Sequence, residues 1–115
     1  MLIEKYVMDY LSEKLGVPVY GQFDDATEKV FLVIEKTGSY TSNKIEHATL
    51  LVQSYTGSIV ESAKLNRKVI KAMNNIIEND TISSIDLNSD YNYTDTSLKR
   101  YRYQAVFDIT YFDYE

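Results

Sequence analysis

The sequence predicts a single α+β domain, residues 1–115, in which a mainly antiparallel sheet of four to five strands carries two helices on one face. Three observations support this prediction. Residues 100–111 alternate between apolar and polar side chains, which is typical of a strand with one wet face. Residues 2–15 and 58–78 instead repeat their apolar side chains at helical spacing. The other strand-like segments lie between and after these helices, so the expected order is αβββαββ.

The first helix is expected over residues 2–15, where apolar side chains recur three and four positions apart. These side chains are Leu2, Ile3, Tyr6, Val7, Tyr10, Leu11 and Leu15. Gly16 and Pro18 mark its end, because glycine accepts the left-handed conformation that often follows a helix and proline cannot continue one. Residues 17–23 then predict a short strand, and residues 24–28 a turn. Pro18 has no N–H to donate, which favours a strand start or a sheet edge.

A hairpin is expected next. Residues 30–35 are apolar on both faces, which indicates a central strand covered on both sides, by helices on one side and by another segment on the other. Residues 36–43, KTGSYTSN, are rich in turn formers and predict a polar hairpin tip. Residues 45–55 alternate again and predict the returning strand.

The second helix is expected to begin at a capping box. In this motif the Ser58 hydroxyl accepts the Glu61 amide N–H, and the Glu61 carboxylate returns to the amide of Ser58. The helix is expected to end near Glu78. The core side is predicted to hold Ala63, Val69, Ile70, Met73, Ile76 and Ile77, and the outer side Lys64, Arg67, Lys68 and Lys71.

The last two strands are expected over residues 81–87 and 100–111, with a polar loop over residues 88–97 between them. One face of the final strand is predicted to enter the core, with Tyr101, Tyr103, Ala105, Phe107, Ile109 and Tyr111. The other is predicted to be wet, with Arg100, Arg102, Gln104, Asp108 and Thr110. On this assignment Phe107 is a core residue and Gln104 is exposed.

The composition excludes several classes of function. The formal net charge of -5 argues against specific nucleic-acid binding, because phosphate binding depends on clustered Lys and Arg. The chain has no cysteine, which excludes disulfides, thiolate zinc sites and a cysteine nucleophile. It also has no apolar run of the roughly 20 residues that span a bilayer. Glu4 and Asp9 lie where a signal peptide would be apolar, so we expect neither a membrane segment nor a signal peptide.

No catalytic or cofactor-binding residue is predicted. His47 is the only histidine, and it lies in an alternating strand without a second histidine or a cysteine to build a site, so it is assigned no role. Asp24 and Asp25 are adjacent in an expected turn, where their side chains diverge and do not form an acid and base pair.

One string, DLNSDYNYTDTS, resembles a metal site in part. Asp86, Asn88 and Asp90 fit the first three ligand positions of a calcium-binding helix-loop-helix loop. The pattern then fails, since Tyr91 replaces the glycine of the sixth position and Ser97 the glutamate of the twelfth. We therefore expect a solvated loop and no metal site.

Tyrosine is unusually frequent, with 11 residues of 115, while tryptophan is absent. One explanation is β-propensity with partial burial, and the other is a protein interface, where tyrosine is enriched. A buried strand face accounts for Tyr101, Tyr103 and Tyr111. It leaves free Tyr91, Tyr93 and Tyr114, so both explanations stay open.

The order and texture of the whole chain resemble tail terminator, or tail completion, proteins of long-tailed phages that infect Gram-positive bacteria. The features that carry the resemblance are an N-terminal helix, VPVYGQ, the strand FLVIEKTGS with Asn43 soon after, QSYTGS, a helix opening with Ser58, Ser62 and Ala63, and the final RYRYQAVFDITY. The resemblance implies a structural virion protein, not an enzyme.

In that family the protein forms a hexameric ring on the end of the tail tube, stops polymerisation of the tube and presents a surface to the head-closure or connector protein. The expected partners are therefore other copies of the chain, the tail tube protein and the connector. The expected location is the head-tail interface of the virion after assembly in the host cytoplasm. A head-closure or minor capsid protein, and a small ligand-binding α+β domain, are the alternatives.

Six residues are candidates for the interface. Loops carry recognition while a sheet positions them, which favours Ser39 and Tyr40 in the expected hairpin tip and Tyr91 and Tyr93 in the expected loop. Two arginines, Arg100 and Arg102, lie on the wet strand face, where a planar donor can meet a carboxylate of another subunit.

Overall fold

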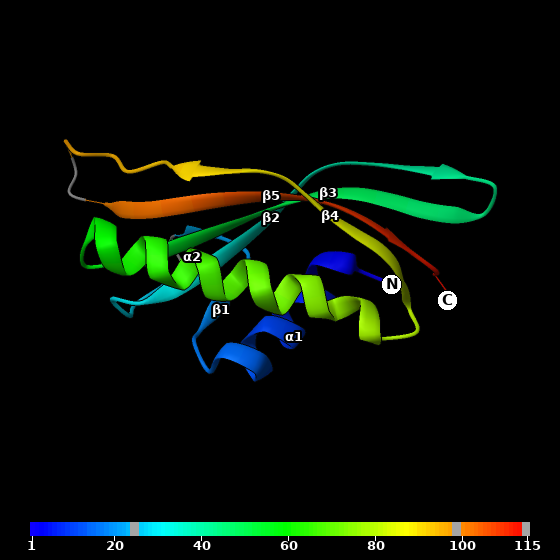
Figure 1. The fold of residues 1–115 in the computed structure, drawn as a ribbon, viewed down its shortest axis with the longest axis horizontal. Helices are drawn as coiled ribbons and strands as arrows, with labels where there is room; N and C mark the ends of the chain where they lie inside the picture. Colours follow the sequence, from blue (N-terminus) through cyan, green and yellow to red (C-terminus); the bar gives the residue numbers. More distant parts are fainter. Residues whose placement is uncertain (24–25, 98–99, 114–115) are drawn as a thin grey trace.

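The computed structural model describes residues 1–23, 26–97 and 100–113. Its elements are α1 (Ile3–Leu15), β1 (Val19–Tyr20), β2 (Phe31–Ser42), β3 (Ile45–Thr56), α2 (Ile59–Asn74), the 3-10 helix η2 (Asn75–Glu78), β4 (Ile82–Asn92) and β5 (Tyr101–Tyr111). The predicted α+β class and the order αβββαββ are confirmed. Both helices lie on the same side of the sheet (Figure 1).

The sheet has five strands in the order β1-β2-β3-β5-β4. The two-residue β1 runs parallel to β2, and the other neighbours are antiparallel. Pro18, which precedes β1, accepts a hydrogen bond at its carbonyl from the Leu32 amide (2.9 Å), so the predicted position of this segment at the sheet edge is confirmed. The middle strand of this order is β3, whereas the sequence had predicted β2, which lies one position nearer the edge, between β1 and β3.

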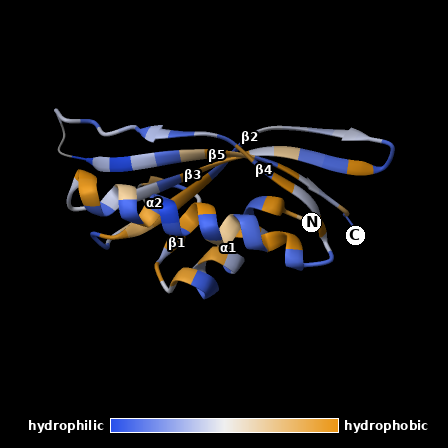
Figure 2. Cartoon of the chain, viewed as in Figure 1, coloured by the Kyte–Doolittle hydropathy of each residue, from blue (hydrophilic) through white to orange (hydrophobic). Residues whose placement is uncertain are grey.

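The main core lies between the helices and the sheet. Its fully buried side chains include Val7 and Leu11 from α1, Val69 and Met73 from α2, and Phe107 from β5. Figure 2 shows apolar and polar residues alternating along the helices and strands that enclose this core. The predicted inward set of the final strand holds for its second half, because Ala105, Phe107, Ile109 and Tyr111 are all buried.

The sequence predicted a hairpin here, but its first strand, β2, is much longer than the predicted residues 30–35. Residues 36–42, expected as a tip because of their turn formers, continue β2, and the turn is confined to Asn43 and Lys44. Both turn residues have positive φ (52° and 67°), the backbone combination that joins antiparallel strands with two residues. Pairing with β3 therefore overrides the low strand propensity of KTGSYTS.

A similar correction applies to β4. Residues 88–92, expected as part of a loop, continue the strand alongside β5. The register shifts between Ile82 and Ser84 and again between Leu87 and Ser89, so β4 carries two bulges. Bulges on an edge strand interrupt its hydrogen-bonding edge and limit pairing with other chains.

The second helix differs from its prediction at individual positions. Ile77, predicted to enter the core, is 50% exposed, because the tighter winding of η2 rotates it away from the sheet. Ala63 is only half-buried. Two polar residues that the prediction omitted, Ser62 and Asn66, are buried instead, and the Asn66 amide donates to Asp90 Oδ2 (2.9 Å).

The start of α2 forms half of the predicted capping box. The Ser58 hydroxyl accepts the Glu61 amide N–H (3.1 Å). The other half is wrong, since the Ser58 amide N–H donates to Thr56 Oγ1 (3.3 Å) and Glu61 pairs with Lys64 instead. Thr56 thus takes the place that the motif gives to the glutamate.

We expect Ser58→Ala to lower the free energy of unfolding by about 1 kcal/mol, because it leaves an amide N–H of the first helical turn without its side-chain acceptor. Glu61→Ala is the matched control, and it should cost no more than about 0.5 kcal/mol because its carboxylate is exposed and is not part of the cap. Urea unfolding followed by circular dichroism measures both. Equal losses at the two positions would contradict this account of the cap.

The molecule is elongated, with principal extents of 45 × 24 × 23 Å. The turn between β2 and β3 and the start of β5 lie at opposite ends of the sheet (Figure 1). Residues 35–44 are all exposed and are here called the β2–β3 arm; Lys36 at its base lies 3.8 Å from Glu4 of α1, and the end of the arm projects beyond the helices. Neither helix of the described chain has the length and apolar character that crossing a membrane requires.

Candidate interface on the open sheet face

The sheet face that the helices leave uncovered, here called the open face, holds the alternate residues of each strand. Strand register places the following residues on it: Phe31, Val33, Glu35 and Tyr40 of β2, His47, Thr49, Leu51, Gln53 and Tyr55 of β3, Arg102, Gln104, Val106, Asp108 and Thr110 of β5, and Asp86 and Tyr91 of β4. The face therefore combines aromatic, amide and charged groups.

A small second core covers the open face near β1. Phe31 and Tyr55 stack in parallel with ring centroids 4.8 Å apart, and Phe23 packs on both. Phe31, Val33 and Tyr55 are buried there. This confirms the prediction that the first part of β2 is covered on both faces, and it shows that the segment after β1 supplies the second cover.

Arg102 lies beside this second core. Its guanidinium donates from Nη1 to the Tyr55 hydroxyl (2.6 Å) and from Nε to the Tyr93 carbonyl (2.7 Å). It also stacks over the Tyr93 ring, 4.3 Å from the centroid, while Arg100 lies 4.3 Å above the ring of Phe23. Tyr91 meets Tyr93 edge to face at 5.9 Å. The structure thus gathers four of the predicted residues at one end of the open face, and we call them the arginine–tyrosine cluster: Tyr91, Tyr93, Arg100 and Arg102.

Hydrogen bonds link this cluster across three strands. The Tyr55 hydroxyl donates to Gln53 Oε1 (3.3 Å), Gln53 Nε2 donates to Gln104 Oε1 (2.7 Å), and Gln104 Nε2 donates to the Tyr91 hydroxyl. Gln104, predicted to be exposed, is only 4% exposed. The prediction was wrong because neighbouring side chains from β3 and β4 close over the amide and satisfy it.

The other two predicted residues lie on the β2–β3 arm. Tyr40 stacks on His47, with centroids 4.4 Å apart and ring planes at 6°, and His47 Nδ1 lies 3.3 Å from Thr110 Oγ1. Ser39 is in register with Ala48 and therefore points toward the helix side of the arm. Both border a hollow of about 250 Å³ that His47, Thr49 and Asp108 also line.

The sequence reasoning missed the contribution of His47 to this hollow. The short turn at Asn43 and Lys44 places Tyr40 directly opposite His47, so the hairpin register was the signal that could have found it. Asp24, Asp25 and Tyr114, which the sequence reasoning also considered, lie outside the described residues.

Residues 86–92 of the string that resembles a calcium loop are part of β4, and residues 93–97 follow the strand. Asn88 donates to Asp108 Oδ2 (3.2 Å), and Asp90 accepts from Asn66, so these side chains point away from one another and have protein partners. The expected loop is therefore a strand over residues 88–92, and only residues 93–97 lie outside it. Within residues 1–23, 26–97 and 100–113, no group of three or more His, Asp or Glu side chains comes together as a metal site would require.

Tyr111, Tyr10 and Glu28 have shifted pKa values, and none of them belongs to the arginine–tyrosine cluster. Burial raises the pKa of Tyr111, with Glu46, Asp113 and Glu4 nearby adding to the effect. Burial likewise raises the pKa of Tyr10, whose hydroxyl donates to the Ala72 carbonyl (2.6 Å). The hydrogen bond from Tyr20 lowers the pKa of the exposed Glu28 carboxyl.

The open face is thus a broad surface of aromatic rings and hydrogen-bonded amides that carries an arginine–tyrosine cluster at one end and a tyrosine–histidine stack at the other. Tyrosine and arginine are among the side chains enriched at protein interfaces and at their energetic centres. No protein-family model matches the chain, and no curated protein matches it either.

Proposed function

We propose that the chain is a structural subunit of a phage tail, a tail terminator that forms a ring at the head-proximal end of the tail tube. In this role it stops polymerisation of the tube and offers a joining surface to the head connector. It acts in the virion after assembly in the host cytoplasm, and it needs no cofactor. The resemblance of the whole chain to tail terminator proteins is the starting point of the proposal.

The observation that carries the proposal furthest is the β2–β3 arm. Residues 35–44 are exposed along an arm whose end projects beyond the helices, and Tyr40 at their centre is 64% exposed. A molecule 45 Å long with an arm at one end and an arginine–tyrosine cluster at the other can contact different neighbours at its two ends. A subunit that joins a tube to a connector requires such separate contact surfaces.

A head-closure protein would need similar surfaces but would bind the connector without stopping tube growth. The test is therefore to polymerise the tail tube subunit of the same phage in the presence and absence of this protein. Electron microscopy then measures the lengths of the tubes. A terminator shortens the tubes and adds a ring to one end, whereas tubes of unchanged length without such rings would overturn the proposal.

A variant pair examines the role of the arm in the same assay. We expect Tyr40→Ser to reduce the fraction of ring-capped tubes, because it removes an exposed aromatic contact without disturbing the core. Val60→Ser is the matched control, since Val60 is similarly exposed (62%) but lies in the first turn of α2, at the end of the sheet opposite the arm. Equal capping by Tyr40→Ser and the unmutated protein would exclude Tyr40 from the contact.

A further inference from the structure

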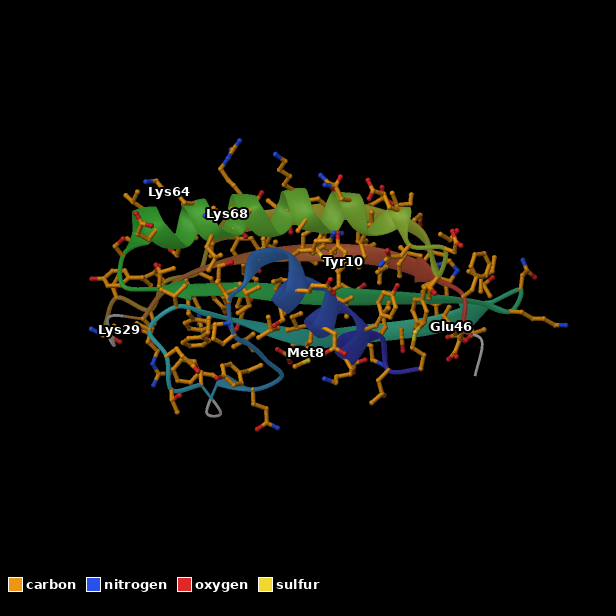
Figure 3. All side chains as sticks on the ribbon, turned by 90° about the horizontal axis from the view of Figure 1, so that it is seen from below. Met8, Tyr10, Lys29, Glu46, Lys64 and Lys68 are labelled. Atoms are coloured by element: carbon orange, nitrogen blue, oxygen red, sulfur yellow. The ribbon has the colours of Figure 1, made fainter. Side chains whose placement is uncertain are left out.

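The basic side chains of this acidic protein are concentrated on α2. Four of the chain's 12 basic residues, against 17 acidic ones, lie on the outer side of this helix: Lys64, Arg67, Lys68 and Lys71. All four are exposed, and Glu61 is the only acidic residue of the helix. Figure 3 labels Lys64 and Lys68 on this helix. We call this surface the basic face of α2.

The subunit itself hardly neutralises this face. Among the described residues, the one ion pair that involves it joins Lys64 to Glu61 (3.6 Å), and both side chains are more than 60% exposed. Arg67 and Lys68 line two grooves, of about 490 and 500 Å³, and Asp90 and Ile70 line the first of them as well. The basic face therefore contains grooves into which side chains of another molecule can fit.

The open face has the opposite charge over the half that lies toward the β2–β3 arm. Glu35, Asp86 and Asp108 point to this side. Asp86 and Asp108 are directly opposite each other on β4 and β5, an arrangement of like charges that costs free energy within a sheet. The arginines of this face lie at its other end, where Phe23 and Tyr93 hold them.

We infer that the basic face of α2 in one copy docks on the acidic half of the open face in the next copy. The contact relieves the repulsion between Asp86 and Asp108 and covers the sheet face that the helices leave open. Because the two surfaces are different, each copy has one of each, and the contact repeats from copy to copy until a ring closes. The inference rests on the proposed function for the closed ring, while the pairwise contact can be measured in the isolated protein.

The absence of cysteine makes a cross-linking experiment specific. Lys68→Cys and Asp86→Cys place one thiol on each proposed surface, and a short bis-maleimide can join them only where the surfaces meet. We expect a mixture of the two single variants to give a cross-linked pair, and the double variant to give a ladder of larger products. Lys29→Cys is the matched control, since Lys29 is an equally exposed lysine outside the basic face. As much product from Lys29→Cys as from Lys68→Cys would overturn the inference.

Charge reversal provides an independent test by analytical ultracentrifugation. We expect Lys68→Glu to weaken self-association about tenfold or more, and Asp86→Lys to restore it when the two chains are mixed. Lys29→Glu should leave association unchanged. A wild-type protein that stays monomeric at low ionic strength, or a pair of reversed chains that does not recover, would contradict the proposed contact.

Two further outcomes separate this inference from the proposed function. Cross-linking without shortening of tail tubes would support the contact and remove the terminator role, whereas shortening of tubes without cross-linking would place the contact between copies elsewhere. If Lys68→Glu instead weakens binding to duplex DNA and leaves self-association intact, a phosphate backbone occupies the basic face and the inference is wrong.

Discussion

Replacing Phe107 with alanine is expected to lower the free energy of unfolding by about 3 to 5 kcal/mol, because it removes a large side chain from a closely packed core. Phe107 is fully buried on the helix side of β5, in register with Leu50 of β3 and Leu87 of β4. Urea unfolding followed by circular dichroism gives the loss directly. A loss of this size approaches the whole stability of many small domains, so the variant should unfold well below the urea concentration that unfolds the wild type.

The neighbouring residue provides the control. Val106 lies on the same strand but on the open face, where it is only partly buried. Val106→Ala should cost about 1 kcal/mol, since it removes two methyl groups that are already partly in water. Equal losses at Phe107 and Val106 would mean that both faces of β5 are covered to the same extent in the isolated protein, and would contradict an open face.

The alternation of β5 shows what could be predicted from the sequence. It identified the strand and the inward position of Phe107, because a period of two residues depends only on backbone geometry. The length of β2 was not predictable in the same way, since residues 36–42 are turn formers that become a strand only by pairing with β3. The predicted exposure of Gln104 was wrong for a related reason. The side chains that bury it come from two other strands, so the pattern within β5 does not reveal them.

The candidate interface was predictable only in part. Tyr91, Tyr93 and the two arginines lie close in the sequence on either side of one connection, so their proximity followed from the expected order of strands. The residues that complete the arginine–tyrosine cluster, Tyr55 and Phe23, come from distant segments that no local pattern connects to it. The sequence thus identified the four residues of the arginine–tyrosine cluster and missed Tyr55 and Phe23, the aromatic side chains that the two arginines contact.

The contacts of Arg102 with aromatic side chains of its own subunit mean that a substitution of Arg102 is also expected to lower the stability of the fold. Its guanidinium makes two charge-assisted hydrogen bonds and stacks on Tyr93, and hydrogen bonds to charged groups contribute about 1.5 to 3 kcal/mol where water is excluded. Because Arg102 is partly exposed, we expect Arg102→Glu to lower the free energy of unfolding by about 2 to 3 kcal/mol in total. Arg100→Glu is the control, and it should cost about 0.5 to 1 kcal/mol because an exposed ring contact is all it loses.

A loss of tube capping in Arg102→Glu would therefore have two explanations, an interface contact and a weakened fold. Arg102→Lys separates them, since lysine keeps the positive charge but cannot reproduce the forked hydrogen bonds to Tyr55 and Tyr93. If the main role of Arg102 is to hydrogen-bond Tyr55 and Tyr93 within the subunit, Arg102→Lys should unfold at a lower urea concentration than the wild type. The variant should still cap tubes at temperatures where it is folded. If both variants unfold like the wild type while only Arg102→Glu fails to cap, the arginine acts by its charge on a neighbouring subunit, and its contacts with Tyr55 and Tyr93 contribute little to stability.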